Sequence, residues 1–143
     1  MTEPATLILR ASLRARLYRD IEVSSSSSLA DLAEVIVAAF GFDMDHAYGF
    51  YSKLTGNLFD SPRRFELFTD IEAGGPRSVN RTRVITAFQK MGSAMSFLYD
   101  YGDEWRLRVE VVETGQAQPG ADYPRIVSKL GRAPPQYPES EHD

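Results

Sequence analysis

Polar residues gather at two places in this chain where their spacing could support chemistry. Asp43, Asp45 and His46 lie within four residues of one another, and Asp100, Asp103 and Glu104 form a second acidic group. Hard divalent cations favour carboxylate oxygens, and one histidine can join them. The first group is therefore a candidate metal site, and a metal-dependent hydrolase is one hypothesis. The same spacing is also typical of a helix exit and a hairpin turn, so we expect no bound metal and no other cofactor.

The same residues could take part in acid–base catalysis. Histidine side chains can act as general acids or bases, so His46 could exchange a proton with a carboxylate such as Asp103 or Glu104. The sequence has no Gly-x-Ser-x-Gly motif, no phosphate-binding Gly-x4-Gly-Lys loop and no cysteine for thiol chemistry. One histidine in a polar loop does not define a catalytic centre, so the favoured hypothesis is a non-enzymatic protein.

Arginines concentrate in the first predicted hairpin, where Arg10, Arg14, Arg16 and Arg19 could form a basic face. Such a face could bind nucleic acid. The chain as a whole carries a net charge of −4, which disfavours non-specific contacts with a phosphate backbone. Charged side chains on edge strands also discourage aggregation of sheets, and we prefer this interpretation. Nucleic-acid binding is kept as the second hypothesis.

A hairpin rich in aromatic residues must position the second acidic group. Alternating runs on both sides of a Gly-Asp-Glu turn predict two antiparallel strands. A three-residue loop would pair Tyr101 with Trp105 and Tyr99 with Leu107, which makes one face wholly apolar. We expect this face to pack against the main helix as a buried aromatic layer.

The same register would place Asp100 opposite Arg106 as a cross-strand ion pair, which gives that carboxylate a structural role. We therefore interpret this part of the hairpin as a structural motif. It comprises Tyr99, Asp100, Tyr101, Gly102, Asp103 and Trp105.

The N-terminal region predicts a hairpin followed by a helix. Apolar and polar residues alternate on both sides of a tight reversal near Ala15. Apolar residues then recur at helical spacing over residues 29–40, with Ser28 as the N-cap and Gly41 beyond the C-terminus. One hairpin register matches apolar residues with apolar residues and a cation with an anion. It pairs Leu13 with Leu17, Leu9 with Ile21 and Arg10 with Asp20.

These elements predict an α+β fold, a mainly antiparallel sheet with one main helix packed on a face. The ββαβ start is β-grasp-like, and a C-terminal hairpin extends it. We expect a single domain over residues 1–143, with a core at 5–113. The proline-rich extension at 114–143 should run over the surface, anchored by Tyr123 and Tyr137.

Several segments together resemble the plasmid pRiA4b ORF-3-like family, in the same order along the chain. They are residues 17–23, 29–32, 39–43, His46, Phe50, the Tyr-Asp-Tyr-Gly-Asp-x-Trp string at 99–105, 123–125 and the two prolines at 134–135. Members occur on bacterial plasmids, mobile elements and chromosomes, and some carry a transposon-passenger, TnpR-like name that suggests a resolvase. The sequence contains nothing that resembles a resolvase motif.

Departures from the family pattern limit what the resemblance implies. Many members have histidines where Tyr48 and Leu107 stand here, and cysteines near Ile126 and Ala133. This chain therefore resembles a cysteine-free branch. A metal or catalytic role that depends on those histidines and cysteines does not carry over.

The leading functional hypothesis is a non-enzymatic protein-interaction module that contacts another protein through a sheet edge or the proline-rich tail. A nucleic-acid-binding accessory protein and a metal-dependent hydrolase are the alternatives. No apolar run is long enough to span a bilayer, and the N-terminal residues lack a signal-peptide pattern. We therefore expect a cytoplasmic protein without a membrane partner.

Overall fold

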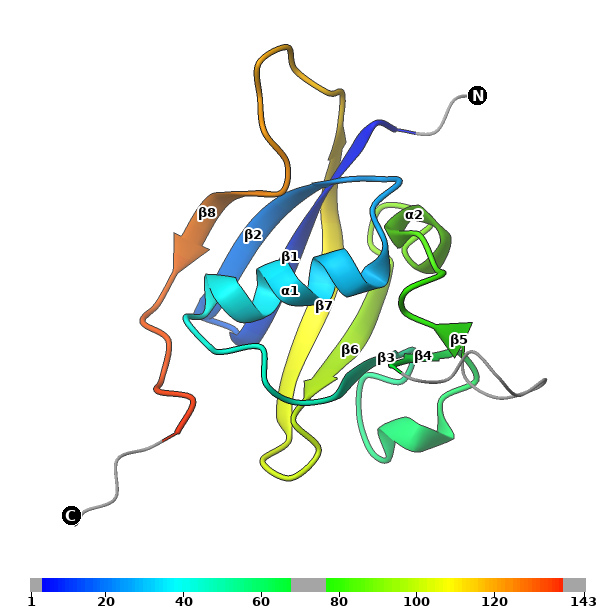
Figure 1. Cartoon of the computed structure of the whole chain (residues 1–143), viewed down its shortest axis with the longest axis vertical. Coiled ribbons are helices and arrows are strands. Elements are labelled where there is room, and N and C mark those ends of the chain that lie inside the picture. Colours follow the sequence, from blue (N-terminus) through cyan, green and yellow to red (C-terminus); the bar gives the residue numbers. More distant parts are fainter. Residues whose placement is uncertain (1–3, 68–76, 138–143) are drawn as a thin grey trace.

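A mainly antiparallel sheet with one long helix across it forms the framework of the computed structural model, which describes residues 4–67 and 77–137 (Figure 1). The described strands form one eight-stranded sheet of order β5-β4-β3-β6-β7-β1-β2-β8. The predicted α+β class with one main helix is confirmed. The elements are β1 (Thr6–Arg14), β2 (Leu17–Ser24), α1 (Leu29–Ala39), β3 (Tyr48–Tyr51), the 3-10 turn η1 (Leu58–Asp60), β4 (Arg64–Glu66), β5 (Arg77–Ser78), α2 (Val84–Ala87), β6 (Ala94–Tyr99), β7 (Trp105–Gly115) and β8 (Arg125–Leu130).

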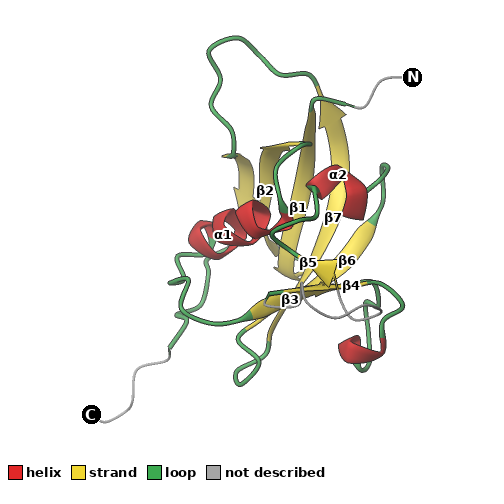
Figure 2. Ribbon diagram, turned by 45° about the vertical axis from the view of Figure 1, so that its right-hand side comes forward, coloured by secondary structure: helices red, strands yellow, loops and turns green. Residues whose placement is uncertain are grey.

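Helix α1 begins where the sequence predicts and ends within one residue of the predicted end. The Ser28 hydroxyl accepts from the Asp31 amide, and the Asp31 carboxylate accepts from the Ser28 amide, which makes a capping box. The helix ends at Ala39, one residue before the predicted end, with Phe40 as its C-cap, and Gly41 follows with a φ of 75°, a left-handed conformation that glycine adopts without strain. Its apolar stripe, with Leu32 and Ile36 fully buried, packs on the sheet beside α2 (Figure 2).

The first hairpin confirms most of its predicted register. Leu9 lies opposite Ile21, and Arg10 lies opposite Asp20. The predicted pair at the hairpin end is wrong, because a register shift after Ser12 brings Arg14, rather than Leu13, opposite Leu17. The extra residue is a β-bulge, which increases the local twist.

The second hairpin has the predicted buried face but a longer turn. Tyr99 lies opposite Trp105, and Phe97 lies opposite Leu107, so residues 100–104 form a five-residue connection. The predicted three-residue loop is wrong by a shift of two residues, which leaves the same side chains on the same face. Tyr101 therefore leaves the sheet and is 41% exposed.

Turn conformation explains the longer connection. Asp100 and Glu104 both have positive φ, 67° and 55°, and the Glu104 amide donates to the Asp100 carbonyl. The Asp100 carboxylate accepts from the amides of Gly102 and Asp103. Side-chain bonds of this kind stabilise a left-handed aspartate, which a regular hairpin would not need. The predicted Asp100–Arg106 ion pair does not form, because Asp100 is no longer in a strand.

The aromatic layer of this hairpin packs around Trp105 as predicted, except that Tyr101, which we expected in the layer, is exposed. The Trp105 ring is half-buried, and its centroid lies 4.8 Å from that of Phe42, next to the C-terminal end of α1. Tyr99 is fully buried. The indole Nε1 of Trp105 is buried without a hydrogen-bond partner among the described residues.

The C-terminal extension contributes a strand that its proline-rich composition did not predict. Residues 125–130 form β8, which pairs antiparallel with β2 and completes one edge of the sheet. Gly131 ends the strand with a φ of 87°, and a Cβ at this position would lie 2.5 Å from the Arg16 carbonyl oxygen. The predicted surface path therefore begins only after β8. Residues 138–143, including His142, lie outside the described residues.

Candidate functional site

His46 lies in a polar cluster formed by the loop after α1, the turn between β6 and β7, and the C-terminal segment. Its Nε2 lies 3.4 Å from a carboxylate oxygen of Asp45 and 3.4 Å from one of Asp100. The same nitrogen forms a hydrogen bond with the Tyr137 hydroxyl, which in turn donates to Asp45. Three segments far apart in the sequence therefore meet at one imidazole.

Gln136 fastens the C-terminal segment beside this cluster. Its side chain is buried, with its Oε1 accepting from the Asp43 amide and its Nε2 donating to the Asp43 carbonyl and to Asp45. The Tyr99 hydroxyl also donates to the Asp43 carbonyl and accepts from the Asp45 amide. The result is a clamp that joins the tail to the loop at residues 43–46.

Hydrogen bonding lowers the pKa of Asp45 in this clamp. Partial desolvation alone would raise the pKa of Asp45, but hydrogen bonds from Tyr137 and Tyr99 and the proximity of His46 lower it below its usual range. Desolvation, followed by the interaction with the Asp45 carboxylate, raises the pKa of Tyr137 to about 12. Asp45 therefore stays ionised and Tyr137 stays protonated, so the hydrogen bond between them persists at neutral pH.

The predicted metal and catalytic residues do not all converge here. Asp43 contributes backbone groups to the clamp, while Asp45 and His46 contribute side chains. Within residues 4–67 and 77–137, no group of three or more His, Cys, Asp or Glu side chains is arranged to hold a metal ion. Asp103 and Glu104 are exposed on the hairpin turn, and neither has a hydrogen bond or ion pair with His46.

Sequence reasoning included Asp100 in the second acidic group but gave it a structural ion pair, and it missed Gln136 as a member of this cluster. Asp100 is buried and faces His46 instead of the predicted Arg106. Its place in the Tyr-Asp-Tyr-Gly string led us to interpret Asp100 as part of a structural motif, and no local pattern indicated Gln136. Tyr137 was predicted as an anchor of the tail, and its contact with Asp45 agrees with that role.

The four arginines proposed as a basic face have different surroundings. Arg10 makes a bidentate pair with Asp20 and stacks over a tyrosine ring. Arg19 is buried and donates to three backbone carbonyls. Arg14 and Arg16 are exposed. They therefore do not present one continuous basic surface.

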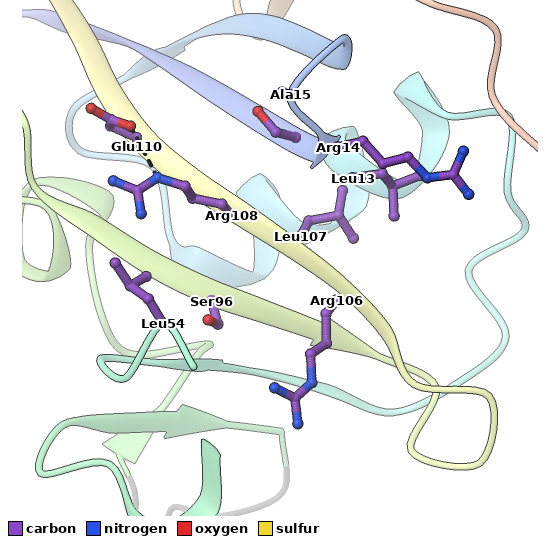
Figure 3. A pocket seen from close by; sticks show the side chains of 10 residues that line it. Leu13, Arg14, Ala15, Leu54, Ser96, Arg106, Leu107, Arg108 and Glu110 are labelled. Atoms are coloured by element: carbon purple, nitrogen blue, oxygen red, sulfur yellow. Dashed lines mark hydrogen bonds and ion pairs between the residues drawn. The ribbon is translucent and has the colours of Figure 1, made fainter. Parts of the chain in front are cut away.

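A hollow of about 510 Å³ opens on the sheet face opposite α1 (Figure 3). Arg14 reaches it from the end of β1, and Arg106 and Arg108 reach it from β7. A small second core on the same face contains Tyr51 and Leu98. The other lining residues are Ser12, Leu13, Ala15, Leu54, Ser96, Leu107 and Glu110.

The outer edge of β8 is a further candidate binding surface. Ile126, Val127 and Leu130 are 48%, 42% and 45% exposed, although aliphatic residues of a strand are usually covered. The opposite edge of the described sheet is β5, which has only two residues. The longer free edge is therefore the one formed by the C-terminal extension.

Together these features define an α+β protein built on one mainly antiparallel sheet, with polar groups at a tail clamp and on the open sheet face. The chain belongs to the plasmid pRiA4b ORF-3-like protein family, whose sequence model matches residues 8–138. No curated protein matches the chain.

A solved structure shares this fold. The protein of unknown function MM3350 from Methanosarcina mazei Go1 is similar with a TM-score of 0.73 and 20% sequence identity, over 94% of this chain and 74% of that chain. At this identity the likeness concerns the fold alone. Neither described helix is long and apolar enough to cross a membrane.

Proposed function

We propose that this protein is a non-enzymatic interaction module that binds an extended segment of a partner protein along β8. The observation that carries the proposal is the exposure of three aliphatic side chains on an edge strand, Ile126, Val127 and Leu130. An edge strand offers unpaired backbone donors and acceptors to an added strand, and its side chains give selectivity.

Fixed contacts at both ends of β8 support this role. At its start, Arg125 makes an ion pair with Glu22 of β2 at 2.8 Å. At its end, the Leu130 carbonyl accepts from the buried Arg19. A strand held in place before binding loses little conformational entropy when a partner adds to it.

Two features would keep this edge from pairing indiscriminately. Val127 lies at a register shift and has no partner residue on β2, which is a β-bulge on an edge strand. Lys129 places a charge beside the aliphatic residues. Natural edge strands use both devices against aggregation, so the proposed partner must match a twisted and partly charged edge.

The clamp around His46 also favours binding over catalysis. The imidazole Nε2 has partners in Asp45, Asp100 and Tyr137, and His46 does not line the hollow on the open sheet face. A general base needs access to a substrate proton.

We further propose that this chain represents a cysteine-free branch of the family, that the protein is cytoplasmic and that its role is associated with mobile elements.

Selection of peptides from a displayed random library, with the full chain as bait, tests the proposal. Val127→Pro removes the amide of the one β8 residue without a partner residue on β2, and Ala117→Pro in an exposed loop is the matched control. We expect selected peptides to bind Val127→Pro at least about tenfold more weakly and the control equally well. Recovery of no peptide, or equal binding to both variants, would contradict the proposal.

A further inference from the structure

We propose that the open face of the sheet binds the phosphate group of a nucleotide-sized ligand, in the hollow lined by Arg14, Arg106 and Arg108. This site lies outside the proposed β8 edge and does not depend on it. The geometry of the hollow, its charge and its apolar lining each support the assignment.

Short side chains on both sides of Arg108 create the hollow. Arg108 lies opposite Ser96 on β6 and opposite Ser12 on β1, so a long cationic side chain is flanked by two small ones. The bulge after Ser12 then turns the end of β1, which brings Arg14 to the rim (Figure 3). The strand register thus leaves an open space between the stems of the three arginines, whose guanidinium groups lie at different sides of its rim (Figure 3).

These arginines keep donors available for a ligand. Arg14 has no hydrogen bond or ion pair with any residue in the described part of the chain. Arg106 uses Nη1 on the Gly56 carbonyl and has Nη2 3.9 Å from a Glu104 carboxylate oxygen, and Arg108 uses Nε on Glu110. Each guanidinium has five N–H groups, so most remain free.

The local charge is opposite in sign to that of the whole chain. Three arginines and one glutamate line the hollow, whereas the chain carries a net charge of −4. Arg106 and Arg108 belong to β7, which lies between β6 and β1, so protection of a sheet edge does not account for them. Positive charge concentrated in a concavity attracts anions.

The presence of three guanidinium groups around one hollow favours a phosphate ligand over a single carboxylate. One guanidinium can satisfy a carboxylate through two hydrogen bonds, whereas phosphate offers further oxygens to additional donors. The exposed Leu54 and the half-buried Leu13 provide apolar surface for the remainder of the ligand. The volume of about 510 Å³ is within the usual size range of small-molecule sites.

The test is a titration of the full chain with AMP, with adenosine as the phosphate-free control ligand. We expect AMP to bind at least about tenfold more tightly than adenosine, and Arg108→Ala and Arg14→Ala each to weaken AMP binding by about tenfold. Arg16→Ala is the matched control, because it removes the same charge from an exposed neighbour that does not line the hollow. Its affinity for AMP should stay within about twofold of the wild type.

A short oligodeoxyadenylate distinguishes the two sources of such a phosphate. Tighter binding of the oligonucleotide than of AMP, lost in Arg108→Ala, would assign the site to a nucleic-acid strand, and equal or weaker binding would assign it to a free nucleotide. Equal affinity for AMP and adenosine would overturn the proposal. So would unchanged AMP affinity in both Arg14→Ala and Arg108→Ala, whose exposed positions allow normal folding.

Discussion

Replacement of Arg19 by alanine should destabilise the whole sheet rather than impair binding of a ligand. The Arg19 side chain is 6% exposed, and its guanidinium donates to the carbonyls of Ala39, Tyr18 and Leu130 at 3.1, 2.8 and 3.1 Å. These carbonyls belong to the end of α1, to β2 and to β8. One cation therefore joins three elements.

The size of the effect follows from these contacts. A hydrogen bond with a charged group contributes about 1.5–3 kcal/mol, and three bonds from one side chain contribute less than three times that amount because solvent partly replaces them. The guanidinium also lies 4.8 Å from the centre of the Phe40 ring, a contact of about 0.5–1 kcal/mol. We expect Arg19→Ala to lower the free energy of unfolding by about 3–5 kcal/mol, or the melting temperature by roughly 10–15 °C.

Urea unfolding followed by the fluorescence of Trp105, the only tryptophan, measures this change directly. Arg19→Lys should recover less than about half of the loss, because one ammonium cannot reach three separate carbonyls with good geometry. Arg16→Ala, an exposed control on the same hairpin, should stay within about 0.5 kcal/mol of the wild type. If Arg19→Ala unfolds at the same urea concentration as this control, the structural role assigned to Arg19 is incorrect.

Two further predictions concern the C-terminal segment. Burial alone would raise the pKa of Glu22, but hydrogen bonds from Thr6 and Arg125 overcome this and lower it below its usual range. Its contribution to stability is therefore present above the unfolded-state pKa of about 4–5 and is lost as the pH falls through the lower folded-state value. Hydrogen exchange of the β8 amides, corrected for intrinsic rates, should become faster in the wild type as the pH falls. In Glu22→Gln the corrected exchange rates should depend less on pH. Parallel pH profiles of the two proteins would contradict the role assigned to Glu22. Gln136→Ala removes three hydrogen bonds to the loop at residues 43–46, so a protease should cleave residues 132–137 faster while α1 stays protected. An unchanged cleavage rate would show that Tyr137 alone holds the tail.

Local patterns sufficed to predict α1 and much of the first hairpin. The helix combines an apolar stripe with a capping serine and a terminal glycine, all within a short stretch of sequence. Leu9–Ile21 and Arg10–Asp20 pair as predicted because both apolar and charged matches select one register. The second hairpin was harder, since alternation determines the buried face but is unchanged by a shift of two residues. There, the left-handed conformations of Asp100 and Glu104 set the turn.

Long-range contacts explain what the sequence did not predict. Strand β8 needs the edge of β2 to pair with, and no local pattern in a proline-rich stretch indicates such a partner. The approach of Asp100 to His46 likewise depends on the packing of two distant loops. Arg19, in contrast, did leave a signal. It lies opposite Ala11 and alternates in phase with Leu17 and Ile21, so the strand pattern already pointed it toward the core.

A charged group whose polar atoms have partners within the chain stabilises the fold, whereas one without such partners is available to a ligand. His46 and Arg19 are the obvious candidates by residue type, but their polar atoms are engaged within the chain. A ligand that recruited either group would first have to break those contacts, and the lost stability would reduce its affinity. Arg14 and Arg108 would have to break few such contacts, because Arg108 has one side-chain partner, Glu110, and Arg14 has none in the described part of the chain. We therefore expect ligand contacts on the open sheet face, where charge is accessible, and not at the clamp, where the chain satisfies its own polar groups.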